Sequence, residues 1–129
     1  MTFRSVLIAN RGEIAIRIAR ACNELGMRAV TVFSEDDAAS LHTRMADEAV
    51  ALSGRGVKAY LDGPQLVDLA KAHGCDAIHP GYGFLAENAD FARQCDQAGL
   101  VFIGPSPEVL EGFGDKSAAR TLAERCDVP

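Results

Sequence analysis

Short aliphatic runs and amphipathic segments alternate along the chain, and this alternation indicates its secondary structure. Uninterrupted runs of Val, Ile, Leu and Ala are typical of strands buried on both faces of a sheet. Segments with apolar residues three or four positions apart are typical of helices packed against such a sheet. The predicted strands cover residues 5–10, 28–34, 48–52, 76–79 and 100–103, and the predicted helices cover 13–25, 64–73 and 86–98.

The first helix shows the pattern most clearly. Its apolar stripe comprises Ile14, Ile18, Ala21, Cys22 and Leu25, and its polar stripe comprises Glu13, Arg17, Arg20 and Glu24. Gly26 is expected to end it, because glycine adopts the left-handed backbone of a helix C-terminus without steric cost. Two more helices are predicted, one beginning at Pro107 behind a Ser106 cap and one over residues 116–125 behind Asp115.

Strands separated by helices of this length predict a parallel sheet with right-handed crossovers and helices on both faces. The predicted fold class is therefore α/β, Rossmann-like in the broad sense. Residues 36–40 and 53–56, which join predicted elements, are expected to be flexible loops.

Composition narrows the class of protein. The 129 residues are 48% hydrophobic and 24% charged, which is the balance of one globular domain. The net charge of −5 and the scattered Lys and Arg residues provide no basic stripe, so nucleic-acid binding is disfavoured. The apolar run near the N-terminus is too short for a signal sequence or a membrane span. A cytoplasmic protein without a membrane partner is expected.

The cysteines show no spacing typical of a metal site. Cys22, Cys75, Cys95 and Cys126 include no CxxC pair, and each lies in or beside an apolar stretch. Free cysteine in such a setting behaves as a small hydrophobic residue. Reduced thiols in the core are therefore expected, and no metal site is predicted.

Three polar segments are expected at the carboxyl edge of the sheet, where helix N-termini and loop amides bind ligands. The first, residues 10–13, lacks the second and third glycines of the GxGxxG pattern, so a nicotinamide site is disfavoured. The segment from Asn10 to Glu13 forms either a polar turn before a helix or a ligand contact. The residues alone leave both interpretations open.

The second segment, residues 79–88, is His-Pro-Gly-Tyr-Gly-Phe-Leu-Ala-Glu-Asn. Glycines on both sides of Tyr82 give a backbone that can approach a ligand closely, with one aromatic hydroxyl presented. His79 is interpreted either as a structural hydrogen-bonding group or as a catalytic one, since no partner nucleophile is recognisable. Glu87 and Asn88 have the alternative role of capping the next helix.

The third segment, residues 112–117, is Gly-Phe-Gly-Asp-Lys-Ser. Lys116 is expected in the first turn of a helix, where the helix dipole disfavours a positive charge, so an anionic ligand would offset that cost. The segment does not match the Walker pattern GxxxxGK(S/T), however. A phosphate ligand and a solvated lysine are therefore alternatives.

Seven short motifs stand in register along the chain. They are Ala-Asn-Arg-Gly-Glu-Ile-Ala from Ala9, Ala-Asp-Glu-Ala from Ala46, Tyr60-Leu61, Ala-Ile-His-Pro-Gly-Tyr-Gly-Phe-Leu from Ala77, Glu87-Asn88-Ala89, Phe-Ile-Gly-Pro from Phe102 and Gly-Asp-Lys from Gly114. Together they resemble the biotin carboxylase component of biotin-dependent carboxylases, over essentially the whole chain. The resemblance implies that residues 1–129 form its N-terminal, pre-ATP-grasp domain, without the ATP-grasp and later domains.

The resemblance also implies chemistry. The family uses MgATP and bicarbonate, through carboxyphosphate, to carboxylate N1 of the biotin ureido ring. Lys116 matches a lysine that contacts the ATP phosphates as a point charge. Tyr82 and Gly83 match a loop near the biotin and bicarbonate pocket with a positioning role, and His79 and Glu87 are expected to shape that loop. The magnesium ligands and the glycine-rich lid belong to later segments, so the isolated fragment is expected to show no turnover.

Partners and acceptors follow from the same resemblance. A biotin carboxyl carrier domain and a carboxyltransferase domain or subunit act with this component, and the first helix often joins a homodimer, so Arg20 and Glu24 are expected to face a partner. Residues 52–58 are shorter than the usual proline- and alanine-containing segment, and Asp62 stands where Asn is commoner. The short segment resembles that of single-chain acyl-CoA carboxylases. Acyl-CoA, pyruvate and urea enzymes share this front end, so the final acceptor stays open.

Two alternatives to a biotin carboxylase are considered. Another ATP-grasp ligase, such as a carbamoyl phosphate synthetase or a purine-biosynthetic ligase, shares the architecture, but it is not expected to carry His-Pro-Gly-Tyr-Gly-Phe-Leu in this register. A stand-alone binding or dimerisation module without catalysis would make Lys116 dispensable.

Overall fold

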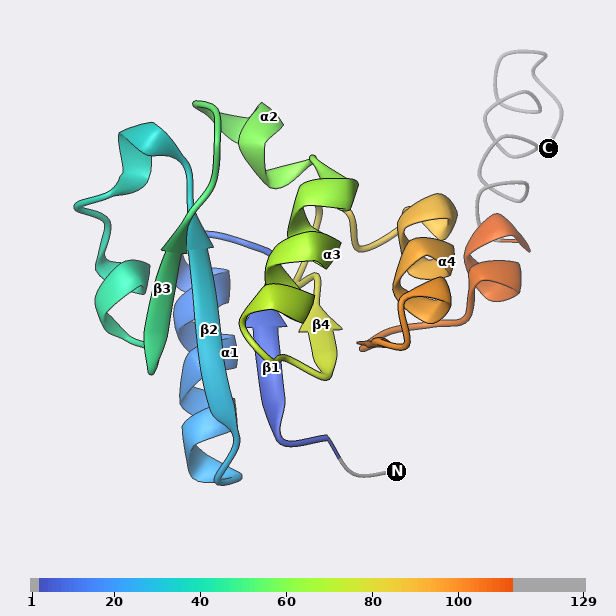
Figure 1. Cartoon of the computed structure of the whole chain (residues 1–129), viewed down its shortest axis with the longest axis horizontal. Coiled ribbons are helices and arrows are strands. Elements are labelled where there is room, and N and C mark those ends of the chain that lie inside the picture. Colours follow the sequence, from blue (N-terminus) through green and yellow to red (C-terminus); the bar gives the residue numbers. More distant parts are fainter. Residues whose placement is uncertain (1–2, 113–129) are drawn as a thin grey trace, which may run out of the picture.

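Five parallel strands form the centre of the computed structural model, which describes residues 3–112. They are β1 (Ser5–Ile8), β2 (Arg28–Phe33), β3 (Glu48–Ala51), β4 (Ala77–His79) and β5 (Val101–Phe102), in the spatial order β3-β2-β1-β4-β5 (Figure 1). The predicted α/β class is confirmed. The order reverses between β1 and β4, and such a reversal is where an open parallel sheet commonly binds ligands.

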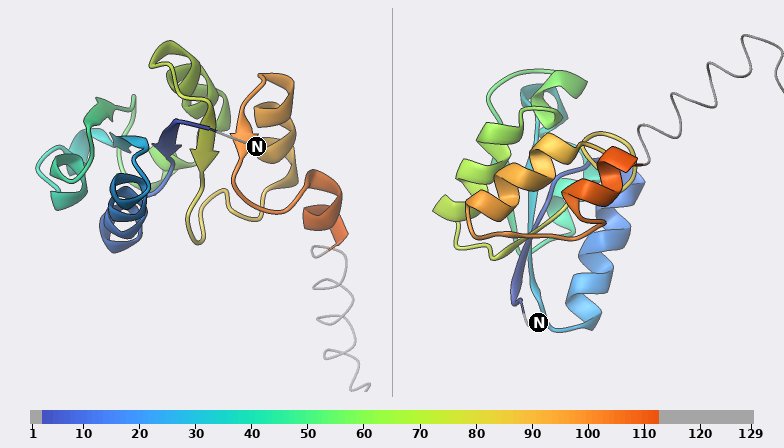
Figure 2. Two further views of the ribbon diagram at one scale, coloured as in Figure 1. Left: turned by 90° about the horizontal axis from the view of Figure 1, so that it is seen from below. Right: turned by 90° about the vertical axis from the view of Figure 1, so that its right-hand side faces the viewer.

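Helices cover both faces of this sheet (Figure 2). One face packs against α1 (Gly12–Glu24), and the other packs against α2 (Val57–Tyr60), α3 (Gly63–Ala72) and α4 (Ala89–Gln97). Two short 3-10 helices, η1 (Glu35–Asp37) and η2 (Leu41–Arg44), connect β2 to β3. The predicted helix over 116–125 lies outside the described residues.

Side chains of the central strands alternate between two cores. Leu7 of β1 and Val30 of β2 belong to the core beneath α3 and α4. Their neighbours Val6, Ile8 and Ala29 belong to the core beneath α1. Because β1 is buried on both faces, every residue from Ser5 to Ile8 is buried, and this explains its nearly uninterrupted aliphatic sequence.

Several helix ends follow the capping residues in the sequence. Asp62 accepts a hydrogen bond from the Gln65 N–H at 3.2 Å and so begins α3, as the commoner Asn would. Asn88 accepts from the Phe91 N–H at 2.9 Å, so α4 begins at Ala89. The prediction that this helix begins at residue 86 is wrong, because residues 84–87 form a turn ahead of the cap.

The segment after β2 is held more firmly than expected. Residues 36–40, expected to be a flexible loop, include the end of η1, where the Asp37 side chain is buried. In η2, the His42 side chain is also buried, with 1% of the residue exposed. These two polar groups are paired with partners near the end of β1, as described below.

The cysteines within the described residues behave as core groups. Cys22, Cys75 and Cys95 are buried and free, as predicted, and Cys126 lies outside the described residues. Burial raises the pKa of the Cys75 thiol to about 11 and that of Cys95 to about 12, so both are protonated and unreactive at neutral pH. Between residues 3 and 112, no helix has the length and apolar character needed to cross a bilayer.

Asp76 holds the N-terminal end of β1 against the start of β4. Its carboxylate accepts hydrogen bonds from the backbone N–H of Arg4, at 3.1 and 3.2 Å, and from that of Ser5 at 3.1 Å. In Asp76→Ala both amides lose this acceptor, so we expect the free energy of unfolding to fall by about 1–3 kcal/mol in denaturant titration. Asp68→Ala is the control, because Asp68 is exposed on α3 and makes no side-chain hydrogen bond in the described part of the chain. Equal losses in the two variants would contradict this role of Asp76.

Candidate functional site

The turns that follow β1 and β4 meet at the carboxyl edge of the sheet. Asn10, directly after β1, is 1% exposed, and its Nδ2 donates hydrogen bonds to the carbonyl oxygens of Pro80 at 2.8 Å and Tyr82 at 2.9 Å. Its Oδ1 accepts from the Arg11 N–H at 2.8 Å. One buried amide therefore joins two segments that are 70 residues apart in sequence, at the point where the strand order reverses.

Gly81 lies directly against this amide and leaves no room for a side chain. Its φ is +71°, and a Cβ there would lie 2.5 Å from Asn10 Nδ2 and 2.8 Å from Ile14 Cγ2. The backbone conformation and the close approach therefore both require glycine at this position. His79 completes the turn, since its Nδ1 accepts from the Gly81 N–H at 3.0 Å. Burial lowers the pKa of His79, which favours the neutral ring that this acceptor role needs.

Tyr82 and Gly83 form the exposed tip of the turn. Tyr82 is 82% exposed, and Gly83, with φ +71°, has open space where a Cβ would stand. The chain then returns to the fold at Phe84, whose ring lies 5.7 Å from the ring of Tyr60, centroid to centroid. Glu87 is exposed further along the same connection. The turn is thus fixed at both ends and presents a phenol and an open stretch of backbone.

A second polar cluster supports the end of β1 from the other side. The Arg11 guanidinium donates to both oxygens of Asp37, at 2.7 and 2.8 Å, and the Tyr60 hydroxyl donates to the same carboxylate at 2.7 Å. The Tyr60 oxygen in turn accepts from the Ser34 N–H at 3.1 Å. These bonds, that of Arg11 above all, lower the pKa of Asp37 to about 2, so the carboxylate is charged at neutral pH.

His42 closes the N-terminus of α1. Its Nε2–H donates to the Val32 carbonyl at 3.0 Å, because a carbonyl oxygen can only accept. Its Nδ1 is then the acceptor for the Gly12 N–H at 3.4 Å. The first amide of the helix is therefore paired within the protein by a buried histidine.

The structure brings together some of the site residues that the sequence predicts. Of the first polar segment, Asn10 forms the link to the second segment, and Arg11 forms an ion pair. The partners Asp37 and His42 are missed by the sequence argument, because Asp37 is the last of three consecutive acidic residues and His42 stands in a polar stretch without periodicity. Lys116 lies outside the described residues.

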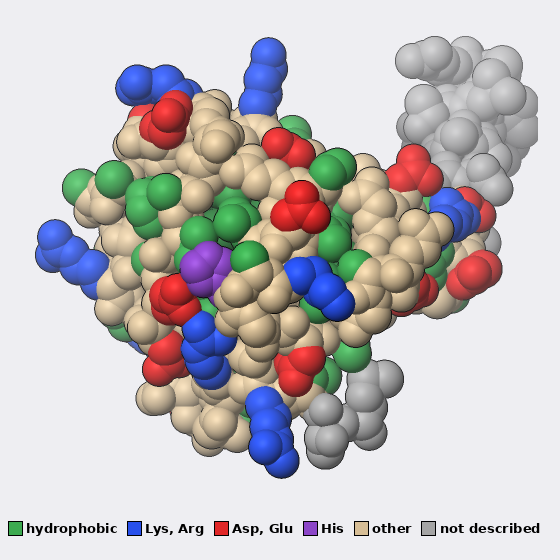
Figure 3. Space-filling view, viewed as in Figure 1, with side chains coloured by type: hydrophobic (Ala, Val, Ile, Leu, Met, Phe, Trp, Pro, Cys, Tyr) green, Lys and Arg blue, Asp and Glu red, His purple; other side chains and the backbone are tan. Residues whose placement is uncertain are grey.

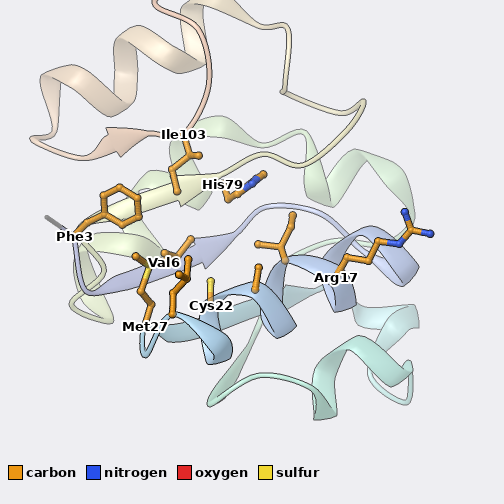
Figure 4. Close-up of a pocket in the computed structure, with 10 residues that line it drawn as sticks. Phe3, Val6, Arg17, Cys22, Met27, His79 and Ile103 are labelled. Carbon is orange, nitrogen blue, oxygen red and sulfur yellow. The ribbon is translucent and has the colours of Figure 1, made fainter. Parts of the chain in front are cut away.

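The charged side chains are mixed on the surface, whereas apolar side chains gather in one hollow. On the face seen in Figure 3, Lys and Arg side chains are interspersed with Asp and Glu and form no continuous basic patch. An apolar hollow of about 330 Å³ lies between α1 and the β4–β5 side of the sheet. Phe3, Val6, Met27 and Ile103 line it together with His79, and the guanidinium of Arg17 points away from them (Figure 4). With few polar groups to orient a ligand, the hollow is a poorer candidate site than the turn at Tyr82.

Comparison with known proteins identifies a family that matches this chain. The model of the N-terminal domain of biotin carboxylase matches residues 2–110. A putative urea carboxylase of Emericella nidulans is 55% identical over 126 residues, which are 98% of this chain and 10% of that protein. The chain thus spans about a tenth of the length of this curated relative.

Two solved structures show the same fold. The biotin carboxylase domain of a single-chain bacterial carboxylase is 63% identical, with a TM-score of 0.87 over 98% of this chain and 30% of that one. The biotin carboxylase domain dimer of the Hydrogenobacter thermophilus 2-oxoglutarate carboxylase, in complex with ADP, MgADP and bicarbonate, is 47% identical. Its TM-score is 0.88, over 100% of this chain and 28% of that one.

The Asp37 cluster generates a prediction about pH. Because the pKa of Asp37 is about 2 in the folded protein and 3.8 ordinarily, its stabilising contribution is complete above pH 4 and is lost as the pH falls towards 2. In Asp37→Asn we expect a loss of about 1–2 kcal/mol at pH 7, a figure reduced for the 44% exposure of the Arg11 side chain. Chemical denaturation of the wild type and of Asp37→Asn between pH 2 and pH 7 measures both the pH dependence of the stability and the loss at pH 7.

The same titration includes Tyr60→Phe, which leaves the ion pair in place. This variant removes one donor to Asp37 and the acceptor of the Ser34 N–H but keeps the Arg11 pair, so it should lose about 1–3 kcal/mol and retain most of the pH dependence. If Asp37→Asn were as sensitive to acid as the wild type, the cluster would not be the source of this dependence.

Proposed function

Because the chain belongs to the biotin carboxylase N-terminal domain family, we propose that it forms the front part of an ATP-dependent biotin carboxylase. In that reaction ATP phosphorylates bicarbonate, giving ADP and carboxyphosphate. The carboxyl group then passes to N1 of biotin, and inorganic phosphate is released. The domain is proposed to extend over residues 1–129, and the later ATP-grasp segments are proposed to belong to a longer polypeptide.

The observation that carries this proposal is the fixed, exposed turn at Tyr82 and Gly83. Its two ends are held by Asn10 and by the Phe84–Tyr60 contact, so the phenol and the open backbone lie at a set place on the ligand-binding edge. Tyr82 offers a hydroxyl group and Gly83 offers backbone polar groups, which bind by hydrogen bonds. We therefore assign Tyr82 and Gly83 to positioning the ureido ring and bicarbonate, with His79 and Glu87 shaping the turn.

Lys116 is proposed to contact the ATP phosphates as a point charge that stabilises the transferring phosphoryl group. The complex of the 2-oxoglutarate carboxylase domain with MgADP and bicarbonate supports the same nucleotide and metal here. Among residues 3–112, no three His, Cys, Asp or Glu side chains gather in a way that suits a metal ion. We place the magnesium ligands in the later part of the enzyme.

The proposed partners are a biotin carboxyl carrier domain and a carboxyltransferase domain or subunit. Arg20 and Glu24 are exposed on α1, which is compatible with the proposed homodimer contact, and the 2-oxoglutarate carboxylase relative is described as a dimer. The buried free thiols suit a reducing compartment, and we propose the cytoplasm. Relatives named for urea and for 2-oxoglutarate are both close in sequence, so this domain does not specify the acceptor.

The native polypeptide provides the first test of the proposed function. An antibody raised against this domain should detect, in source cells, a species several times heavier than 13.7 kDa. Binding of streptavidin to that species would indicate a single-chain carboxylase, and its absence would indicate a separate carboxylase subunit. A native species of 13.7 kDa would contradict the proposal and leave a binding or dimerisation module.

Lys116 can be tested in the 129-residue chain itself. With ATP at a concentration equal to its Kd, binding adds about 0.4 kcal/mol and should raise the melting temperature by about 2 °C. We expect Lys116→Ala to abolish this rise, because its charge is the proposed phosphate contact. Lys58→Ala is the matched control, since Lys58 is exposed and makes no side-chain hydrogen bond within residues 3–112. A rise that persists in Lys116→Ala would contradict the assignment.

A further inference from the structure

Both polar atoms of the Asn10 side chain are hydrogen-bonded, and most of their bonds are directed at one turn. Both Nδ2 protons are donated to that turn, one to the Pro80 carbonyl and one to the Tyr82 carbonyl. Its Oδ1 is occupied by the Arg11 N–H. With 1% of the residue exposed, water cannot replace these bonds.

These bonds fix the direction of the exposed tip. With the carbonyls of Pro80 and Tyr82 turned inward, the Pro80–Gly81 and Tyr82–Gly83 peptide planes are set. The Tyr82 side chain makes no hydrogen bond within the described part of the chain, and it is 82% exposed. Its orientation therefore depends on the backbone that Asn10 holds, rather than on contacts of its own.

We infer that Asn10 is a positioning residue for biotin, acting through Tyr82 and Gly83 without touching the ring. The inference rests on the proposed function and adds to it a buried residue that determines the affinity for the ureido ring. An amide is required at position 10, because a carboxylate of the same shape would place one of its oxygens, in the position of Nδ2, 2.8 and 2.9 Å from two carbonyl oxygens. Asn10→Asp therefore changes the turn with little change in volume.

The test uses the complete carboxylase polypeptide, with MgATP, bicarbonate and free biotin as the probe. For Asn10→Asp we expect kcat/KM for biotin to fall by roughly tenfold to a hundredfold, since a displacement of about 1 Å has effects of this size. The KM for ATP should stay within about twofold, because the bonds of Asn10 reach only the turn and Arg11. Loss of fold alone would not produce this split between the two substrates.

A double-mutant cycle separates positioning from general destabilisation. If Asn10 acts through the tip, the double variant Asn10→Asp/Tyr82→Ala should lose little more kcat/KM for biotin than Tyr82→Ala loses alone. Gly81→Ala disturbs the same contact from the turn, because its Cβ would displace Asn10 Nδ2. It should reproduce the selective loss of kcat/KM for biotin. Asn23→Asp, the same chemical change at an exposed position of α1, should leave both KM values unchanged.

The outcomes are distinct. Equal losses for biotin and ATP, full additivity with Tyr82→Ala, or an unchanged kcat/KM for biotin in Asn10→Asp would each overturn the inference while leaving the proposed function intact. A wild-type polypeptide without biotin-dependent ATP turnover would overturn the proposed function and the inference together. If the aspartate prevents folding, Asn10→Ser, which keeps one donor, is expected to show the same selectivity with a smaller loss.

Discussion

The hydrogen bonds of one buried amide, that of Asn10, join the two halves of the structure at the carboxyl edge of the sheet. The sheet itself accounts for the proximity of β1 and β4, but it leaves the turns beyond the strands undetermined. Asn10 closes that gap by bonding two carbonyl groups of the facing turn, and Gly81 is the residue that allows the approach. This contact determines the backbone geometry of the exposed tip at Tyr82.

Around that contact, the buried polar side chains that the structure describes near the end of β1 are all paired. Asp37 neutralises Arg11 and accepts from Tyr60, while His42 pairs an amide of α1 with a carbonyl of β2. Buried polar groups rigidify a fold when all of their bonds are made, since any unmade bond carries the full cost of desolvation. The polar groups at this edge are therefore held in place where they support the turn, and the tip at Tyr82 is exposed.

The sequence predicts the elements of this fold better than its contacts. Uninterrupted aliphatic runs define strands buried on both faces, so the parallel sheet and its class follow from local pattern. The bond from Asn10 to the turn spans 70 residues, and nothing local distinguishes a bridging asparagine from one that caps a helix. Asp37 and His42 are unpredicted for the same reason, because their burial depends on where β2 and α1 meet. The family resemblance leads to the proposed role of the turn at Tyr82, and the structure shows which contacts hold that turn.

The 70-residue separation also determines when the tip acquires its shape. During synthesis, β1, α1 and β2 emerge first and can pair through short connections, whereas β4 must be made and docked beside β1 before Asn10 has anything to bond. Contacts of such long range form late, because loop closure must precede them. The exposed position of Tyr82 therefore depends on a completed fold, because a nascent or partly folded chain contains the same residues in sequence without the contact that fixes the turn.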